Sequence, residues 1–108
     1  MIYDPIRKKE VPLTPEERVR QAVVHLLTHQ LDYPPTLIAN EYTITVGKLS
    51  RRCDTVVFTP QLQPLMILEY KAPHIPLSEK VIQQAFQYNT TLQVPYIALS
   101  NGRQTLLY

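Results

Sequence analysis

The segment Leu65–Lys71 constrains the fold more than any other part of this sequence. Its first four residues are apolar, and charged side chains enter only at Glu69 and Lys71. A nearly continuous apolar run of this length is typical of a strand buried on both faces. Such a strand needs neighbouring strands at its edges and other layers over its faces. The sequence therefore predicts a sheet flanked by helices.

Two segments have the apolar spacing of amphipathic helices. The first begins at Thr14, a residue that can cap a helix, and Glu17 follows it at the spacing of a capping box. We expect this helix to end before Pro34. The second begins at Ser78 and ends before Val94 and the proline that follows it.

Alternating or β-branched runs predict the strands of the sheet. These runs are 37–46, 54–59, 65–71, 95–100 and 105–108. From residue 14 the elements follow the order α-β-β-β-α-β-β, which predicts an α/β fold with a mixed sheet. Residues 1–13 have no apolar period and predict an extended lead-in, so the expected domain is 14–108. Its last strand-like run has no polar tail, which predicts a domain truncated at its C-terminus or a minimal version of a longer one.

Composition excludes several classes of protein. No apolar run is long enough to cross a bilayer, and the start of the chain lacks the features of a signal peptide. We therefore expect a cytoplasmic protein without membrane contact. One cysteine, Cys53, excludes an internal disulfide and a cysteine-based zinc site, and two glycines leave no Walker-type loop.

The charge of the chain gives little information about partners. The formal net charge is only +2, so the total does not argue for nucleic-acid binding. Basic residues gather in two places, Arg7–Lys9 and Lys48 with Arg51 and Arg52, and the second cluster lies just before Asp54. Without other evidence, solvated charge runs are the favoured interpretation of both clusters.

Glu69 and Lys71 need a physical explanation, because an unpaired charge at the end of a buried strand is costly. Residues two apart in a strand project from the same face, so the carboxylate and the ammonium lie side by side. Asp54 begins the preceding predicted strand, and an antiparallel hairpin brings its carboxylate next to that of Glu69. Two adjacent carboxylates repel each other unless a cation lies between them, and such a hard oxygen site suits Mg²⁺.

Asp54 followed by Glu69-Tyr70-Lys71 resembles the D…ExK signature of the PD-(D/E)XK nuclease superfamily, whose common core has the predicted element order. Gln84 and Tyr88 in the following helix have the QxxxY pattern, which resembles the N-terminal nuclease domain of type I restriction enzyme R subunits. The opening helix with Arg18-Val19-Arg20-Gln21 is also similar to that group. Cys53 stands where a proline often precedes the aspartate, a departure that the superfamily tolerates.

The resemblance implies a role for each of these residues. Asp54 and Glu69 would hold Mg²⁺, for which Mn²⁺ can substitute, and Lys71 would act on the attacking water and on transition-state charge. Gln84 and Tyr88 would contact the site or the DNA backbone. Glu17 is the candidate for a further metal ligand from the first helix, with Glu16 as its substitute.

Each of these residues also has a simpler interpretation. Glu69 and Lys71 could form a surface ion pair, and Asp54 could cap a turn. Gln84 and Tyr88 could be ordinary polar residues beside an apolar stripe, and Glu17 could serve only the capping box. His25 and His29, four apart, lack the surrounding pattern of a zinc site and are expected on a helix face.

Taken together, the residues and the resemblance predict a Mg²⁺-dependent DNA endonuclease domain that hydrolyses phosphodiester bonds. The alternative is a non-catalytic nucleic-acid-binding or assembly module with the same fold. DNA is the expected partner. The small sheet and its apolar end also predict a homodimer or a missing partner domain or subunit.

Overall fold

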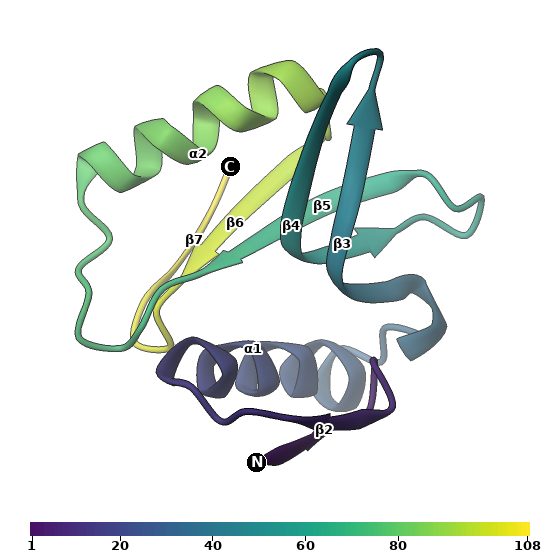
Figure 1. Cartoon of the computed structure of the whole chain (residues 1–108), viewed down its shortest axis with the longest axis vertical. Helices are drawn as coiled ribbons and strands as arrows, with labels where there is room; N and C mark the ends of the chain where they lie inside the picture. Colours follow the sequence, from purple (N-terminus) through teal and green to yellow (C-terminus); the bar gives the residue numbers. More distant parts are fainter.

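The computed structural model describes residues 1–108, apart from the side chains of Tyr88, Thr90 and Thr91. Its elements are β1 (Ile2–Asp4), β2 (Lys9–Val11), α1 (Pro15–His25), β3 (Ile38–Val46), β4 (Leu49–Phe58), β5 (Pro64–Tyr70), α2 (Glu79–Leu92), β6 (Tyr96–Ser100) and β7 (Thr105–Leu107). Figure 1 shows their arrangement. From α1 onward the order is α-β-β-β-α-β-β, so the predicted α/β fold with a mixed sheet flanked by helices is confirmed.

The main sheet has the strand order β3-β4-β5-β6-β7. Strand β5 is its middle strand, as the apolar run Leu65–Leu68 predicted. It pairs with β4 in antiparallel register and with β6 in parallel register, and α2 makes the crossover between the two parallel strands. Pairing continues one residue beyond β5, where the Lys71 N–H donates to the Ser100 carbonyl at 2.9 Å. The end of β5 is therefore fixed on the edge that it shares with β6.

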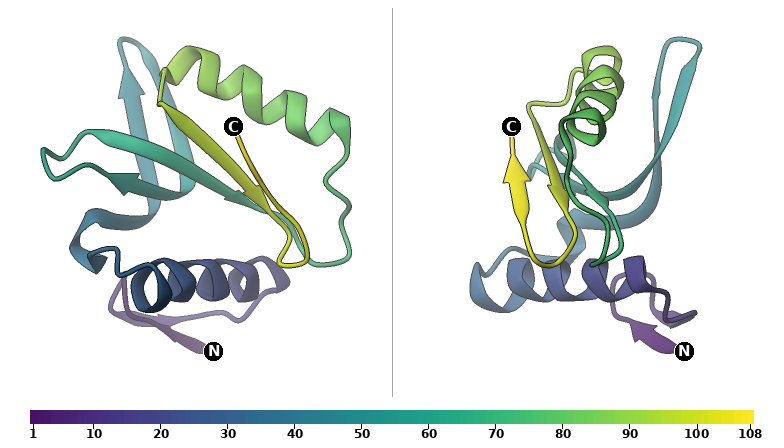
Figure 2. Two further views of the ribbon diagram at one scale, coloured as in Figure 1. Left: turned by 180° about the vertical axis from the view of Figure 1, so that it is seen from behind. Right: turned by 90° about the vertical axis from the view of Figure 1, so that its left-hand side faces the viewer.

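The two helices cover opposite faces of this sheet (Figures 1 and 2). Between α2 and the sheet lies a core cluster of Ile44, Cys53, Val56, Ile67, Ala85, Leu92, Val94, Ile97 and Leu99. Between α1 and the sheet lies a second cluster of Val19, Ile38, Val57, Leu68, Tyr70 and Ala98. Neighbours in sequence such as Ile67 and Leu68 belong to different clusters, because successive side chains of a strand point to opposite faces. Neither helix, in the part of the chain that the structure describes, is long and apolar enough to cross a membrane.

The N-terminal segment, expected as an extended lead-in, contains an antiparallel pair of short strands, β1 and β2. Its anchor is polar. The carboxylate of Asp4 is fully buried, accepts hydrogen bonds from the Ile6 N–H and from the Asn40 amide, and forms an ion pair with Arg7. Arg7 in turn donates to Glu17 of α1 at 2.7 Å. These contacts attach the segment to both α1 and the sheet.

Two element boundaries differ from those predicted. Strand β4 begins at Leu49 rather than Asp54, because Leu49 pairs with Val46 across a tight turn in which Gly47 has φ +61°. Asp54 therefore lies inside the strand. The first helix continues past α1 only as a π-helical turn over Leu26–Gln30, where the Leu31 N–H donates to the carbonyl five residues earlier.

Candidate active site

Asp54 is held at the sheet by contacts on two sides. Its side-chain Oδ2 accepts a hydrogen bond from the Tyr70 N–H of β5 at 2.9 Å. Its backbone carbonyl accepts one from Arg20 Nη1 of α1 at 3.0 Å. The carboxylate therefore has a fixed direction relative to the end of β5.

Glu69 lies directly against Asp54. The predicted proximity of the two carboxyl groups is observed, since Asp54 raises the pKa of Glu69 both by its charge and by a side-chain hydrogen bond between the two groups. Burial, followed by the negative charge of Asp54, raises the pKa of Glu69 to about 8, although Arg51 and Lys71 oppose the shift. Two carboxylates that share one location favour a proton or a cation between them.

Lys71 and Gln84 belong to the same location. A small pocket of about 60 Å³ is lined by Arg51, Glu69, Lys71, Val81, Gln84, Ala85 and Leu99. Lys71 is close enough to Glu69 for its charge to act on that carboxyl group. Gln84 comes from α2, so the helix that crosses from β5 to β6 forms one wall of the pocket. The side chain of Tyr88 lies outside the described residues.

Glu17 is not brought to this pocket. It is buried on the α1 side, where Arg7, Arg20 and Gln21 all contact its carboxylate. Its N–H also donates to the Thr14 hydroxyl, as expected for the capping residue of α1. Glu16, the substitute, is exposed in the first turn of the same helix. The Thr14 cap of α1 is therefore observed, whereas the Glu17 carboxylate forms ion pairs with Arg7 and Arg20 instead of completing a capping box.

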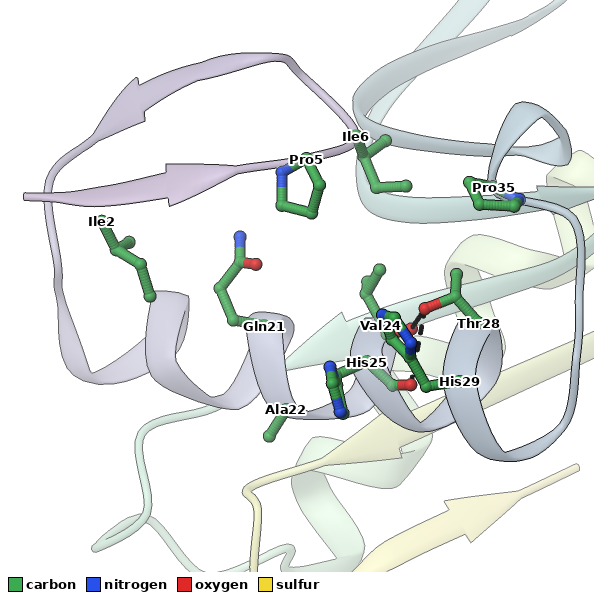
Figure 3. Close-up of a pocket in the computed structure, with 10 residues that line it drawn as sticks. All are labelled: Ile2, Pro5, Ile6, Gln21, Ala22, Val24, His25, Thr28, His29 and Pro35. Atoms are coloured by element: carbon green, nitrogen blue, oxygen red, sulfur yellow. Dashed lines mark hydrogen bonds between the residues drawn. The ribbon is translucent and has the colours of Figure 1, made fainter.

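His25 and His29 lie elsewhere. Their rings stack with centroids 4.2 Å apart, and both line a cavity of about 640 Å³ between α1 and the N-terminal segment (Figure 3). The remaining lining is mainly apolar, with Ile2, Pro5, Ile6, Ala22, Val24 and Pro35 beside Gln21 and Thr28. None of Asp54, Glu69 and Lys71 lines this cavity, so the cavity and the carboxylate pair are separate features.

Arg51 is the site residue whose position the sequence did not predict. Its Nη2 lies 3.4 Å from Glu69 Oε1. In a regular strand, Arg51 and Asp54 would point to opposite faces because they are three residues apart. Both contact Glu69, because the β3–β4 pairing is interrupted where Glu41 faces Asp54 and Glu41 adopts φ +56°. The sequence signal was limited to a basic cluster ahead of Asp54.

Glu69, which lines the pocket, and Asp54, which interacts with Glu69, are ligands of the kind that suits a hard divalent cation. Asp54 and Glu69 offer oxygen ligands, and the described residues include no group of three or more His, Cys, Asp or Glu side chains placed to hold a metal. Mg²⁺ commonly binds through one or two carboxylates and completes its shell with water and phosphate. Two carboxylates beside a small open pocket fit that pattern.

Comparison with known proteins gives one family. Residues 15–108 match the family described as type I restriction enzyme R protein N terminus. Among curated proteins, none matches the chain. The matched range includes both helices, all five strands of the main sheet and the whole of the small pocket lined by Glu69 and Lys71, the carboxylate pocket. The chain therefore belongs to the family of type I restriction enzyme R protein N-terminal domains.

Proposed function

We propose that this domain hydrolyses phosphodiester bonds of DNA with Mg²⁺ bound at Asp54 and Glu69. The observation that carries the proposal is the contact between these two carboxyl groups beside Lys71. Two acids in hydrogen-bonding contact, with a raised pKa at Glu69, are typical of a metal or proton site. The family membership adds a restriction-enzyme context.

Asp54 and Glu69 would hold the ion by their oxygens. Bound there, Mg²⁺ would lower the pKa of a coordinated water and neutralise charge on the scissile phosphate. Asp54 is suited to this role because the Tyr70 N–H and the Arg20 guanidinium already fix its side chain and its backbone. A ligand held in place before binding needs less reorganisation than a free one.

Lys71 would orient the attacking water and offset the negative charge that develops on the phosphate. Its position directly after β5 places the ammonium on the pocket side with Glu69. Gln84 would donate from the opposite wall to water or to a phosphate oxygen. The wall is stable because α2 packs on the sheet through Ala85 and Leu92.

Plasmid nicking at low salt tests the proposal. We expect the wild type to nick DNA with Mg²⁺ or Mn²⁺ and to lose this activity in a chelator. Asp54→Asn and Glu69→Gln should remove both nicking and the thermal stabilisation by Mn²⁺, because each deletes a ligand charge. Lys71→Ala should keep the stabilisation and lose about 100-fold in nicking, because the ammonium acts on the reaction and not on the ion.

Two exposed residues in the first turn of α2 supply matched controls. Glu79→Gln and Lys80→Ala make the same chemical changes outside the pocket and should nick like the wild type. Nicking that survives Glu69→Gln would contradict the proposal.

The alternative function is a non-catalytic nucleic-acid-binding or assembly module. It is favoured by the finding that the described residues include no group of three or more His, Cys, Asp or Glu side chains that could hold a metal ion. DNA binding without any Mn²⁺-dependent stabilisation would select this alternative.

A further inference from the structure

Arg51 lines the carboxylate pocket. It comes from the β3–β4 hairpin, whereas Glu69 and Lys71 come from the end of β5, so the hairpin adds a cation to a site built by other elements. Its side chain is 28% exposed and that of Glu69 is 15% exposed. The guanidinium therefore touches both the buried acid and the solvent.

The charges around the pocket indicate what this contact does. With both acids ionised, Asp54 and Glu69 carry two negative charges, and Arg51 and Lys71 carry two positive charges. A divalent cation added to this set would stand beside two other cations. The Arg51 Nη2 contacts Glu69 Oε1, one of the oxygens that the ion would need. Arg51 and a metal ion are thus competitors for the same carboxylate.

We propose that Arg51 is a phosphate-binding residue that Glu69 holds in the metal-free site and releases to the DNA when the site is loaded. A guanidinium is suited to both positions, since its fork of N–H donors matches a carboxylate and a phosphate equally well. Its partial exposure allows it to turn from one to the other without unfolding the strand. The inference rests on the proposed nuclease function and names a further substrate contact for it.

If Arg51 exchanges Glu69 for a phosphate, its substitution should raise the affinity for Mn²⁺ and lower the affinity for DNA. Arg51→Gln removes the competitor, so Mn²⁺ should bind about three- to tenfold more tightly. Loss of the Arg51 charge also favours protonation of Glu69, which competes with metal binding. Removal of the same positive charge, however, lowers the electrostatic repulsion of a divalent ion by twice as much as that of a proton. Measurement above the pKa of Glu69 makes the protonation effect small. DNA should bind about tenfold more weakly, because one phosphate contact is lost.

Isothermal titration with Mn²⁺ alone and fluorescence anisotropy with a labelled duplex in Ca²⁺ measure the two affinities without cleavage. Arg52→Gln is the matched control, since Arg52 is the next residue of the strand, is 70% exposed and pairs with Glu41 at 2.9 Å. It should bind Mn²⁺ like the wild type. Arg51→Lys keeps the charge and should restore the wild-type Mn²⁺ affinity, a rescue that a purely structural role would not give.

The outcomes separate this inference from the function on which it rests. A wild type that binds no Mn²⁺ would overturn both. If the wild type binds Mn²⁺ while Arg51→Gln binds it no more tightly, or binds DNA as well as before, the role of Arg51 is overturned and the nuclease proposal stands. Circular dichroism of each variant shows that the fold is retained.

Discussion

The buried carboxylate of Asp4 is held by hydrogen bonds and an ion pair, and these contacts lower its pKa. Burial alone would raise the pKa of its carboxyl group, but hydrogen bonds from Arg7, Asn40 and the Ile6 N–H lower it to about 2. The chain of contacts continues inward, since the Thr55 hydroxyl donates to Asn40 and the Tyr70 hydroxyl donates to Thr55. A continuous buried path of hydrogen bonds thus joins the N-terminal segment to the strands that carry the site.

Substitution of Asp4 tests that path through pH. Because the folded-state pKa lies below the ordinary value of 3.8, the ionised group stabilises the fold above pH 4, and this contribution is lost as the pH falls toward 2. Asp4→Asn should lower the free energy of unfolding by about 3 kcal/mol at neutral pH. It should also flatten the acid limb of the stability profile in urea titrations. Asp32→Asn, at an exposed position, should change neither.

At the scale of elements, α2 is defined by its caps. The Ser78 hydroxyl accepts from the Val81 N–H at the start of the helix, and the Asn89 side chain bonds both the N–H and the carbonyl of Val94 at its end. Gln93 closes the helix in the left-handed region with φ +55°. The left-handed conformation is strained for glutamine, so Gln93 lowers the free energy of unfolding. A residue that adopts this conformation without strain would remove that effect.

Two glycine substitutions measure the free energy of this backbone strain. Gln93→Gly should raise the free energy of unfolding by about 0.5–1 kcal/mol, because glycine adopts a positive φ without strain. Gln83→Gly, at an exposed position inside the same helix, should lower it by about 1 kcal/mol. The Tm of both variants, measured by thermal unfolding, tests these expectations. A fall in Tm for Gln93→Gly would contradict the strain argument.

The predictable elements are those whose apolar residues repeat. The middle strand, both helices and the last two strands follow from hydrophobic spacing, because burial of that spacing determines where they pack. The first half of β4 lies mostly exposed in a hairpin, so its residues carry no burial pattern to read. The β1–β2 pair is held by Asp4 and Arg7, a polar anchor that no apolar period reveals.

At the scale of the whole molecule, the carboxylate pocket depends on contacts from both faces of the sheet. The shared face of Glu69 and Lys71 followed from strand parity, and a hairpin suggested Asp54. The arrival of Arg51 did not follow, because it depends on the interrupted pairing at Glu41. Arg20 was likewise hidden, although it joins Glu41 at 2.6 Å and the Asp54 carbonyl at 3.0 Å. Long-range contacts of this kind are set by the assembled sheet and not by local spacing.

The hydrogen bond from the Tyr70 N–H to Asp54 Oδ2 gives the pocket its own spectroscopic probe. An amide proton that donates to an ionised carboxylate resonates downfield, and its shift follows the charge on the acceptor. Titration with diamagnetic Mg²⁺ should therefore move the Tyr70 amide resonance upfield, whereas the Ile97 amide, bonded to the Tyr108 carbonyl at 3.0 Å, should stay in place. A stationary Tyr70 resonance at saturating Mg²⁺ would show that Asp54 takes no part in binding the ion. Occupancy of the site thus becomes readable from a single backbone signal, without DNA and without turnover.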